Sequence, residues 1–400
     1  MMIQRLVNRI LKVIFQNKVK NSIKIFLLVL LVCSCSGKKE NTTELKATQS
    51  DKLTLNSTSR IIQLETNPES LLGFILKINV DFSNDRIFVL SDFNIYIFNS
   101  NGKFLNKLKV GRGPGEIINL MAFTIDAETK LIYAIDNSIK LCIFNYDGNM
   151  INNYDIKSFP SSDISVLNDD NVFLLRNFVG NEEKYFVGLY NISAQKVVRK
   201  FVPAEKSPYP KNSLGVSCNF IQNKGKLYFY TPNVFGLFEY MDSDFHQILS
   251  LDIGKKSVPK SLSNKFEKHN YYRLRENAKS KNFIPFILYA FPFKGYYFIG
   301  ADDKDINCYA INMQNKKIYN NGAISSYFNL PEKVSLRLPK GIQDSLIIFQ
   351  CPPLEFFDSK TKVNAKEIQI AGHQIEVNQD DNPFLIIVNL NSARRFRSEH

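Results

Sequence analysis

The amino-acid sequence predicts an all-β fold, a six-bladed β-propeller. After residue 60 the chain shows short apolar runs bounded by Asn, Asp, Gly and Ser, and no long amphipathic helical pattern, which is typical of strands and hairpins. Within these runs a unit of strand, short loop, strand and tight turn recurs along the chain. The 32 Phe and 18 Tyr residues support this interpretation, because aromatic side chains favour strands.

The repeat is clearest in its first two copies. In the first, the apolar runs 86–92 and 95–99 precede the turn dipeptide Asn101-Gly102. Asn-Gly and Asp-Gly supply the positive φ angles that tight hairpin turns need. The second copy has the same parts at 130–136, 139–145 and Asp147-Gly148.

Weaker copies extend the repeat to six units. The steps between equivalent residues are 44, 40, 55, 69 and 50 residues, which is the length expected of four-stranded propeller blades. A large β-sandwich is the alternative that this pattern leaves open. The equivalent residues are Val89, Tyr133, Phe173, Tyr228, Tyr297 and Ile347.

Two further segments have a predicted place in the ring. A propeller must close on itself to hide its sheet edges. The isolated strand Arg60–Leu64 is suited to closing it by pairing with the last unit, at Leu385–Val388. The longest step contains the polar stretch Leu262–Asn282, which we interpret as a partly helical insertion on one face of the ring.

The N-terminus has the layout of a secretory signal. Residues 1–24 are basic without an acidic residue, and Ile25–Val32 is an apolar run too short to span a membrane. The run ends in Val32-Cys33-Ser34-Cys35, which resembles the lipobox of bacterial lipoproteins, with Cys35 as the lipidated residue. An ordinary signal peptide with incidental cysteines is the alternative.

These features predict four parts of the chain. Residues 1–34 are the signal peptide, 35–58 the lipidated cysteine and a flexible polar tether, 59–391 the propeller, and 392–400 a basic tail. The expected location is the bacterial cell envelope, most simply the outer membrane, with the leaflet undetermined. The expected partners are the membrane, through the lipid anchor, and an unidentified protein or small molecule.

The formal charge of +13 does not indicate nucleic-acid binding. Residues 1–34 hold six of the 51 basic residues and none of the 38 acidic ones, so the remainder carries a net charge of only +7. Such an excess, spread over the whole body, gives weak long-range attraction. The composition therefore argues against a nucleic-acid partner.

The segment Val110-Gly111-Arg112-Gly113-Pro114-Gly115-Glu116 carries a family resemblance. With the lipobox, it resembles the six-bladed β-propeller lipoproteins of the Gram-negative envelope, whose functions are mostly uncharacterised. The resemblance implies the fold and the location, and no catalytic residue. Other matching segments are Leu64–Gly73, Phe98-Asn99, Gly102–Phe104 and Asp381-Asn382-Pro383.

The loop of Gly111, Arg112, Gly113, Pro114, Gly115 and Glu116 has a structural and a ligand-binding interpretation. It lacks the Lys-Ser/Thr pair and the strand-to-helix context of a phosphate-binding loop. We therefore expect a defined turn between the first two blades, with Arg112 and Glu116 paired and unusual backbone angles at Gly113. Contact with a ligand remains the second interpretation.

No other group of residues forms a recognisable site. Cys142, Cys218, Cys308 and Cys351 lack metal-type spacing, and Cys142 and Cys308 fall in apolar strands, where we expect small packed residues. The acidic clusters 302–305 and 380–382 suit a hard cation but are more simply solvated turns. The segment Tyr271–Arg275 suits either a sugar-binding surface or a helix face.

Two functions follow from these observations. The first is an envelope-anchored module that binds a ligand or protein at the funnel of the ring, without a cofactor and without catalysis. The second is a lactonase-like hydrolase or lyase with a metal in that funnel, an analogy with other six-bladed propellers. The second requires carboxylates such as Asp92 and Asp136 to converge on the axis.

Overall fold

The computed structural model describes most of the chain after residue 57. The described residues are 42–44, 53–55, 57–176, 184–203, 219–231, 234–263, 271–303, 305–328, 330, 338–357, 365–370 and 373–389. Residues from Thr42 onward form one compact unit. Among the described residues, no helix is long and apolar enough to cross a membrane. The signal segment, Cys35, Cys218 and the basic tail lie outside the described residues.

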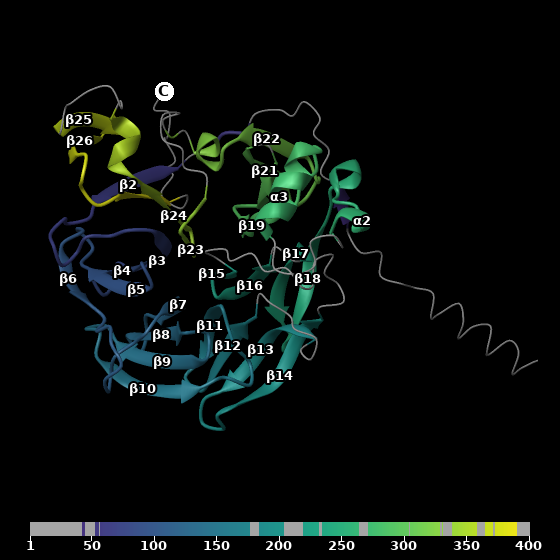
Figure 1. Ribbon diagram of the computed structural model, residues 1–400. Helices are drawn as coiled ribbons and strands as arrows, with labels where there is room; N and C mark the ends of the chain where they lie inside the picture. The colour runs from purple at the N-terminus through teal and green to yellow at the C-terminus, as the bar shows by residue number, and fades with distance from the viewer. Residues whose placement is uncertain are drawn as a thin grey trace, which may run out of the picture. The chain divides into compact units, whose positions relative to one another are not determined.

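Four separate four-stranded antiparallel sheets follow one another along the chain (Figure 1). In each of them consecutive strands are neighbours, as in a meander. The first sheet has β3 (Ile75–Asp81), β4 (Arg86–Ser91), β5 (Asn94–Phe98) and β6 (Phe104–Lys107), and the second has β7 (Leu120–Asp126), β8 (Leu131–Asp136), β9 (Lys140–Asn145) and β10 (Met150–Asp155). The third has β11 (Asp163–Asn168), β12 (Asn171–Leu175), β13 (Tyr185–Asn191) and β14 (Lys196–Pro203), and the fourth has β19 (Ile287–Phe293), β20 (Tyr296–Asp302), β21 (Ile306–Asn312) and β22 (Ile318–Gly322).

A fifth, nine-stranded sheet has the order β1-β18-β17-β16-β15-β23-β24-β27-β2. A single residue pair, Gln222 with Gln343, joins its two halves. One half has β15 (Phe220–Asn223), β16 (Lys226–Thr231), β17 (Val234–Met241), β18 (Asp244–Asp252) and β1 (Thr42–Glu44). The other has β23 (Gly341–Gln343), β24 (Leu346–Cys351), β27 (Phe384–Asn389) and β2 (Thr58–Gln63).

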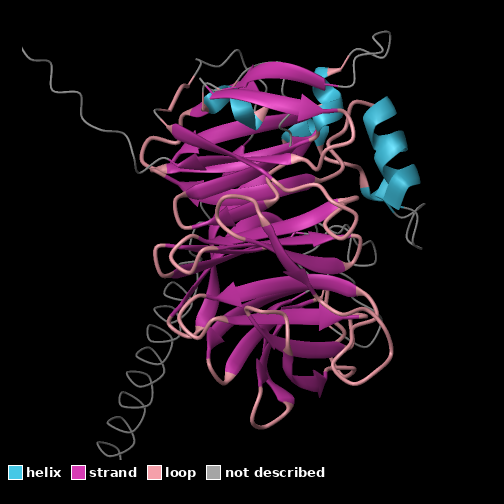
Figure 2. Ribbon diagram, turned by 90° about the vertical axis from the view of Figure 1, so that its left-hand side faces the viewer, coloured by secondary structure: helices cyan, strands magenta, loops and turns pink. Residues whose placement is uncertain are grey.

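The remaining elements lie between these strands. The hairpin of β25 (Ala365–Ile370) and β26 (His373–Asn378) precedes β27. Helices α2 (Lys260–Ser263) and α3 (Tyr271–Ser280) connect β18 to β19, and α3 lies beside one face of the sheets (Figure 2). The predicted helical insertion is therefore confirmed. Single 3₁₀ turns are η2 (Gly254–Lys256), η4 (Ile324–Tyr327) and η5 (Pro353–Phe356).

The six equivalent residues of the sequence repeat all lie in the second strand of a group of four, in β4, β8, β12, β16, β20 and β24. These strands are almost wholly buried, because a neighbouring sheet covers each of their faces; in β4 only Arg86 is partly exposed. The fourth strands, such as β10, are largely exposed. This arrangement of sheets, each buried along its inner strands and exposed at its outer one, is a β-propeller.

The hydrophobic core lies between adjacent sheets. One cluster joins Phe88 and Leu90 of β4 to Phe123 of β7 and Ile132 of β8. A second, rich in aromatic rings, joins Phe173 of the third sheet to other rings of the nine-stranded sheet. Face-to-face packing of this kind buries apolar side chains on both surfaces of the inner strands, which stabilises the ring by roughly 25 cal/mol for each Å² removed from water.

The predicted closure of the ring is confirmed. Strand β2 pairs antiparallel with β27 over its whole length, from Thr58 opposite Asn389 to Gln63 opposite Phe384. A strand from the start of the chain thus completes the sheet formed by the end of the chain. The expected flexible tether, up to residue 58, includes residues that are in fact held by the ring. The backbone N–H groups of Leu53 and Leu55 donate to the side chain of Asn321 and to the carbonyl of Tyr327, and the two leucine side chains pack against the core.

A second contact between the two ends centres on Asn382, which is almost fully buried. Its Nδ2 donates to the carbonyls of Glu65 and Ser70, at 2.7 and 2.8 Å, and its Oδ1 accepts the N–H of Leu72 at 2.8 Å. The segments Leu64–Gly73 and Asp381–Pro383, which carry part of the family resemblance, therefore hold each other. Their role in this structure is architectural.

We expect Asn382→Leu to lower the free energy of unfolding by roughly 2–4 kcal/mol, because the buried N–H of Leu72 and the buried carbonyl of Ser70 lose their partner. Urea unfolding measures the change. The exposed Asn378→Ala is the matched control and should cost less than about 1 kcal/mol. Equal losses in the two variants would contradict the role assigned to Asn382.

Candidate functional site

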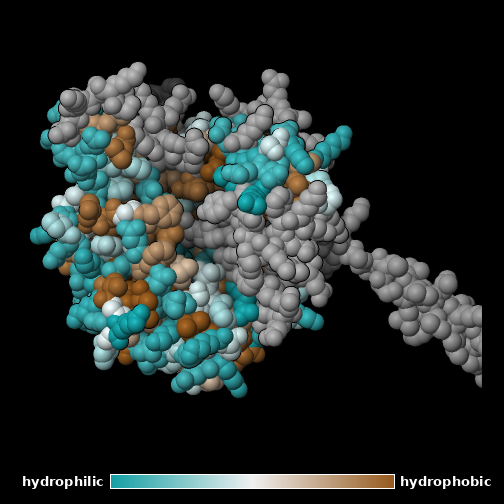
Figure 3. Space-filling model, in the orientation of Figure 1, coloured by the Kyte–Doolittle hydropathy of each residue, from teal (hydrophilic) through white to brown (hydrophobic). Residues whose placement is uncertain are grey.

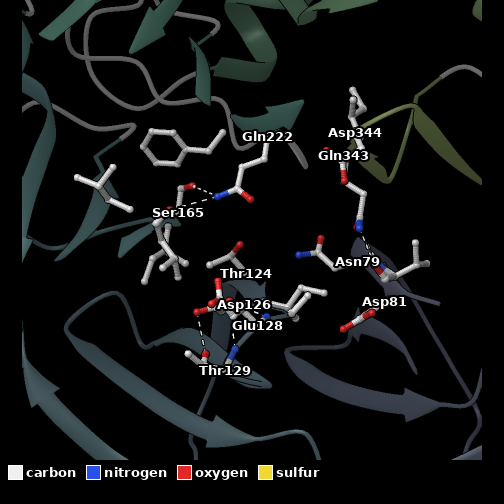
Figure 4. Close-up of a pocket in the computed structure, with 18 of the residues that line it drawn as sticks. Asn79, Asp81, Thr124, Asp126, Glu128, Thr129, Ser165, Gln222, Gln343 and Asp344 are labelled. Carbon is white, nitrogen blue, oxygen red and sulfur yellow. Dashed lines mark hydrogen bonds between the residues drawn. The ribbon is translucent and has the colours of Figure 1, made fainter. Parts of the chain in front are cut away.

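A funnel opens where the first strands of the sheets end. It is a cavity of about 1010 Å³ lined by β3, β7, β11, β15 and β23 and by the turns that follow four of them (Figure 4). These strands run in the same direction along the axis, so their ends meet at one face of the ring, which we call the funnel face. The end at which these strands begin is called the opposite face.

The funnel has a layered lining that follows from strand periodicity. Alternate residues of a strand point to the same side, so Lys77, Asn79 and Asp81 of β3 face the axis at successive depths. A middle belt of uncharged polar side chains receives one residue from each lining strand. The belt consists of Asn79, Thr124, Ser165, Gln222 and Gln343 (Figure 4).

A buried ion pair lies at the base of this lining. Lys77 Nζ is 2.9 Å from Asp163 Oδ1, and the two side chains are 9% and 3% exposed. Asp163 Oδ2 also accepts the backbone N–H groups of Asn219 and Phe220. One carboxylate thus connects β3, β11 and the start of β15 across the axis, and its charge is balanced by a cation and by backbone dipoles.

Glutamine side chains connect the inner strands higher in the funnel. Gln343 accepts the N–H of Val80 at 3.0 Å and donates to the carbonyl of the same residue. Gln222 donates to the carbonyl of Val166 on β11. Gly341 lets β23 approach β3, since a Cβ on it would lie only 2.2 Å from the carbonyl oxygen of Ile78. The belt is therefore held by backbone contacts.

The rim of the funnel is acidic. It contains six carboxylates, those of Asp81, Asp126, Glu128, Asp169, Asp170 and Asp344, whereas Lys77 is the one cation in the lining. An excess of carboxylates in a recess focuses negative potential and attracts cations. The sign is opposite to that of the whole chain.

The rim carboxylates fall into two groups. Asp81, Asp126, Asp170 and Asp344 accept hydrogen bonds from neighbouring turns. Burial acts to raise the pKa of Asp81, but hydrogen bonds from Ser83, Asn84 and Tyr146 outweigh it and lower the pKa below its usual value. Among the described residues, nothing hydrogen-bonds to the side chains of Glu128 and Asp169, nor to those of Asn79 and Thr124, so these four are available to a ligand.

The loop singled out by the sequence lies elsewhere, on the opposite face, between β6 and β7. As expected, it is a defined turn from the outer strand of one sheet to the inner strand of the next: Gly111 N–H donates to Ile117 and Glu116 N–H to Gly113. The expected Arg112–Glu116 pair is wrong, because the Glu116 carboxylate instead accepts the Gly113 N–H at 2.7 Å. The left-handed residue is Gly115, with φ +79°, and not Gly113.

Asp92 and Asp136 do not converge in the funnel. Each lies at the opposite face, at or just after the end of a second strand, and accepts backbone N–H groups from the segment that begins its own sheet. Asp92 binds Phe74 N–H at 3.0 Å, and Asp136 binds Asn119 N–H at 2.6 Å. Their carboxylates stabilise the crossings between sheets.

The other candidates also have structural roles. Asp302 is buried between Arg275 and Lys279 of α3, and Asp303 pairs with Lys256, so the expectation of solvated turns is wrong there. The Asp302 pairs form because α3 packs on the end of β20, and the Asp303 pair joins that end to η2. Asp381 accepts two hydrogen bonds from Asn378 in a turn.

The helix interpretation of Tyr271–Arg275 holds, with Leu274 buried in the core. Cys142, Cys308 and Cys351 are buried, and burial raises the pKa of the Cys142 thiol to about 12. The described residues contain no group of three His, Cys, Asp or Glu side chains placed to hold a metal ion.

The sequence reasoning missed Lys77, Asp163 and the polar belt. One signal was present: Lys77, Asn79 and Asp81 place a polar residue at every second position of an otherwise apolar strand. That pattern is also typical of a strand with one face in water. Which of the two applies depends on the other strands around the axis.

We expect Lys77→Met to lower the free energy of unfolding by about 3–5 kcal/mol, because it leaves the buried Asp163 carboxylate without its cation. Lys157→Met is the matched control: its pair with Asp155 has side chains that are 65% and 57% exposed and should contribute less than about 1 kcal/mol. Chemical denaturation compares the two. Similar losses would show that the axial pair is not special.

In the loop, Gly115→Val should cost about 1–2 kcal/mol, since an L residue resists a φ of +79°. Gly113→Val should cost less, because a Cβ on Gly113 would meet the movable Glu116 side chain, at 3.0 Å. Thermal melts measure both. A larger loss for Gly113 would show that the Glu116 contact, and not the backbone angle, maintains the turn.

Comparison with solved structures supports the fold. A protein from Bacteroides fragilis that is described as exported aligns with a TM-score of 0.65 and 17% identity, covering 87% of this chain and 99% of its own. A member of the DUF4221 family from Bacteroides vulgatus aligns with a TM-score of 0.46 and 12% identity, covering 88% and 98%. At 17% identity, the likeness to the Bacteroides fragilis protein concerns the fold alone.

Comparison with protein families is more direct. Among curated proteins, no match to the chain was found. A family model described as a domain of unknown function (DUF4934) matches residues 32–389, which include the whole described ring and its closing strand. The chain therefore belongs to the DUF4934 family.

Proposed function

We propose that the protein is a lipid-anchored binding module of the bacterial envelope, and that its funnel takes a soluble, positively charged ligand rich in hydrogen-bond donors. The observation that carries this proposal is the lining of the funnel, an acidic rim above a belt of polar side chains. Two side chains of the rim and two of the belt have no hydrogen-bond partner among the described residues. The volume of about 1010 Å³ is that of a site for a small molecule.

The proposal includes six blades. The nine-stranded sheet divides at its single Gln222–Gln343 pair into two four-stranded groups, and each group has the same order of inner and outer strands as the separate sheets. Five inner strands line the funnel. The sixth, β19, is buried along its whole length and contributes nothing to the lining, because β15 pairs directly with β23 in front of it.

The proposed anchor is a lipid on Cys35. Two observations support this anchor. One is the lipobox-like sequence after a short apolar run, and the other is that the similar Bacteroides fragilis protein is described as exported. Two or more acyl chains on one cysteine give a stable attachment to a membrane.

The funnel is tested with spermidine and glucosamine as cationic probes. We expect binding by isothermal titration calorimetry that weakens as salt rises. The substitutions Glu128→Gln and Asp169→Asn remove the two rim carboxylates that have no hydrogen-bond partner among the described residues. Each should reduce the affinity about two- to fivefold, which corresponds to roughly 0.5–1 kcal/mol.

The matched control is the pair Glu376→Gln and Asp380→Asn, which removes two exposed charges far along the chain from the funnel strands. It should leave the affinity unchanged. If neither probe binds, or if the control pair weakens binding as much as the rim pair, the ligand class proposed for the funnel is wrong.

A further inference from the structure

The funnel carries different chemistry at each depth. In β3 the residues that face the axis are Lys77, Asn79 and Asp81, and each is separated from the next by roughly 6.6 Å along the strand. The lining therefore changes from an ammonium group at the base, through an uncharged polar belt, to carboxylates at the rim, over roughly 13 Å. A ligand that enters the funnel meets these groups in a fixed order.

The base of the funnel presents a positive group to the cavity. Lys77 lines the cavity, whereas its partner Asp163 is not among the lining residues. The Lys77 ammonium has three N–H donors, and one of them is directed at Asp163 Oδ1, 2.9 Å away. No other partner of this ammonium occurs in the described part of the chain. The base is therefore suited to an acceptor oxygen of a ligand and unsuited to a second cation.

The belt offers hydrogen-bond donors and acceptors together. The Asn79 amide and the Thr124 hydroxyl each provide both, and neither side chain is hydrogen-bonded within the described ranges. The hydroxyl of Ser165, a residue that is 2% exposed, accepts a long hydrogen bond of 3.5 Å from Gln222. Ligand hydroxyls, which also donate and accept, satisfy these groups, whereas a methylene chain leaves them without partners.

Apolar side chains lie between the polar groups of the lining, and Leu167 and Phe220 are two of them. A wall of this mixed kind suits the C–H groups of a ring whose edge carries hydroxyls. Elsewhere the same sheets present a different surface, and Figure 3 shows hydrophobic patches over β3–β6 and β7–β10. The order of ammonium, polar belt and carboxylates is thus a feature of the funnel and not of the sheets in general.

We propose that the ligand of the funnel is an amino sugar, with its ammonium group at the rim and its hydroxyl groups at the belt and the base. This inference rests on the proposed function and narrows it from cationic ligands in general to one class. The rim carboxylates of Glu128 and Asp169 attract the ammonium. The Asn79 amide and the Thr124 hydroxyl bond to sugar hydroxyls, and Lys77 donates to the oxygen that lies deepest.

A linear polyamine suits the same rim but not the interior. Its ammonium groups are separated by methylene segments, so a chain that follows the axis brings a second cation toward the Lys77 ammonium. The methylene segment lies against the belt and gives Asn79 and Thr124 no partner. A polyamine therefore binds through the rim carboxylates alone, and changes in the belt leave its affinity unchanged.

The test compares glucosamine with spermidine on the full chain by isothermal titration calorimetry. Thr124→Val removes the hydroxyl and keeps the shape of the side chain, so it should weaken glucosamine binding about three- to tenfold. The affinity for spermidine should change by less than about twofold. Asn79→Ala is a second belt variant with the same expected result, and thermal melts identify a variant that does not fold as the parent does.

The matched control is Thr54→Val, at an exposed threonine outside the lining of the funnel. It should leave the affinity for both probes unchanged. A third probe, N-acetylglucosamine, keeps the other hydroxyls of the sugar but replaces the ammonium by a neutral amide. It should bind at least about tenfold more weakly than glucosamine.

The outcomes separate this inference from the proposed function. If glucosamine binds but both belt variants keep the parent's affinity for it, the amino-sugar assignment is wrong although the cation site stands. The same holds if the belt variants weaken spermidine as much as glucosamine. If neither glucosamine nor spermidine binds, the proposed function itself is wrong. N-acetylglucosamine that binds as tightly as glucosamine overturns the placement of the ammonium at the rim.

Discussion

Ring closure is the constraint on which the rest of this structure depends. A row of sheets packed face to face leaves a bare edge and an uncovered face at each end, and neither is tolerated in water. Here the strand β2 from the start of the chain completes the sheet of β23, β24 and β27 from its end. Asn382 strengthens the same junction by holding the segment that leads into the first sheet. Without this junction the inner strands would have no reason to meet on one axis.

The meeting of the inner strands creates the funnel and also the need for charge inside it. Lys77 comes from the first sheet and Asp163 from the third, and neither side chain is stable in that position without the other. The pair, with the backbone N–H groups of the segment entering β15, holds three strands across the axis. Above it, Gln222 and Gln343 connect strands by bonding to backbone carbonyls. Contacts between strands that are far apart in the chain hold the lining in place, as they also close the ring.

The two faces of the ring have opposite chemistry. Several turns between first and second strands are short and carry acidic residues, as at Glu128, Asp169 and Asp344, which makes the funnel rim acidic. Crossings between sheets are longer and retain exposed apolar side chains such as Phe74 and Ile118. The funnel rim and the opposite face therefore use different connections, and changes in one need not disturb the other.

The sequence by itself determined the local structure. The six second strands, the tight turns, the closing strand and the helical insertion follow from short-range patterns, because side-chain alternation and turn residues act over a few neighbours. The sites were decided by tertiary structure alone. One sheet lies between those of Lys77 and Asp163, and the polar belt takes one residue from each of five strands between positions 79 and 343. Gly115 is the residue with a left-handed backbone, and the Glu116 carboxylate accepts the Gly113 N–H. Both facts depend on the path of the loop that joins two sheets. Contacts between residues far apart in the chain exist only once the ring has closed, and no local pattern records them.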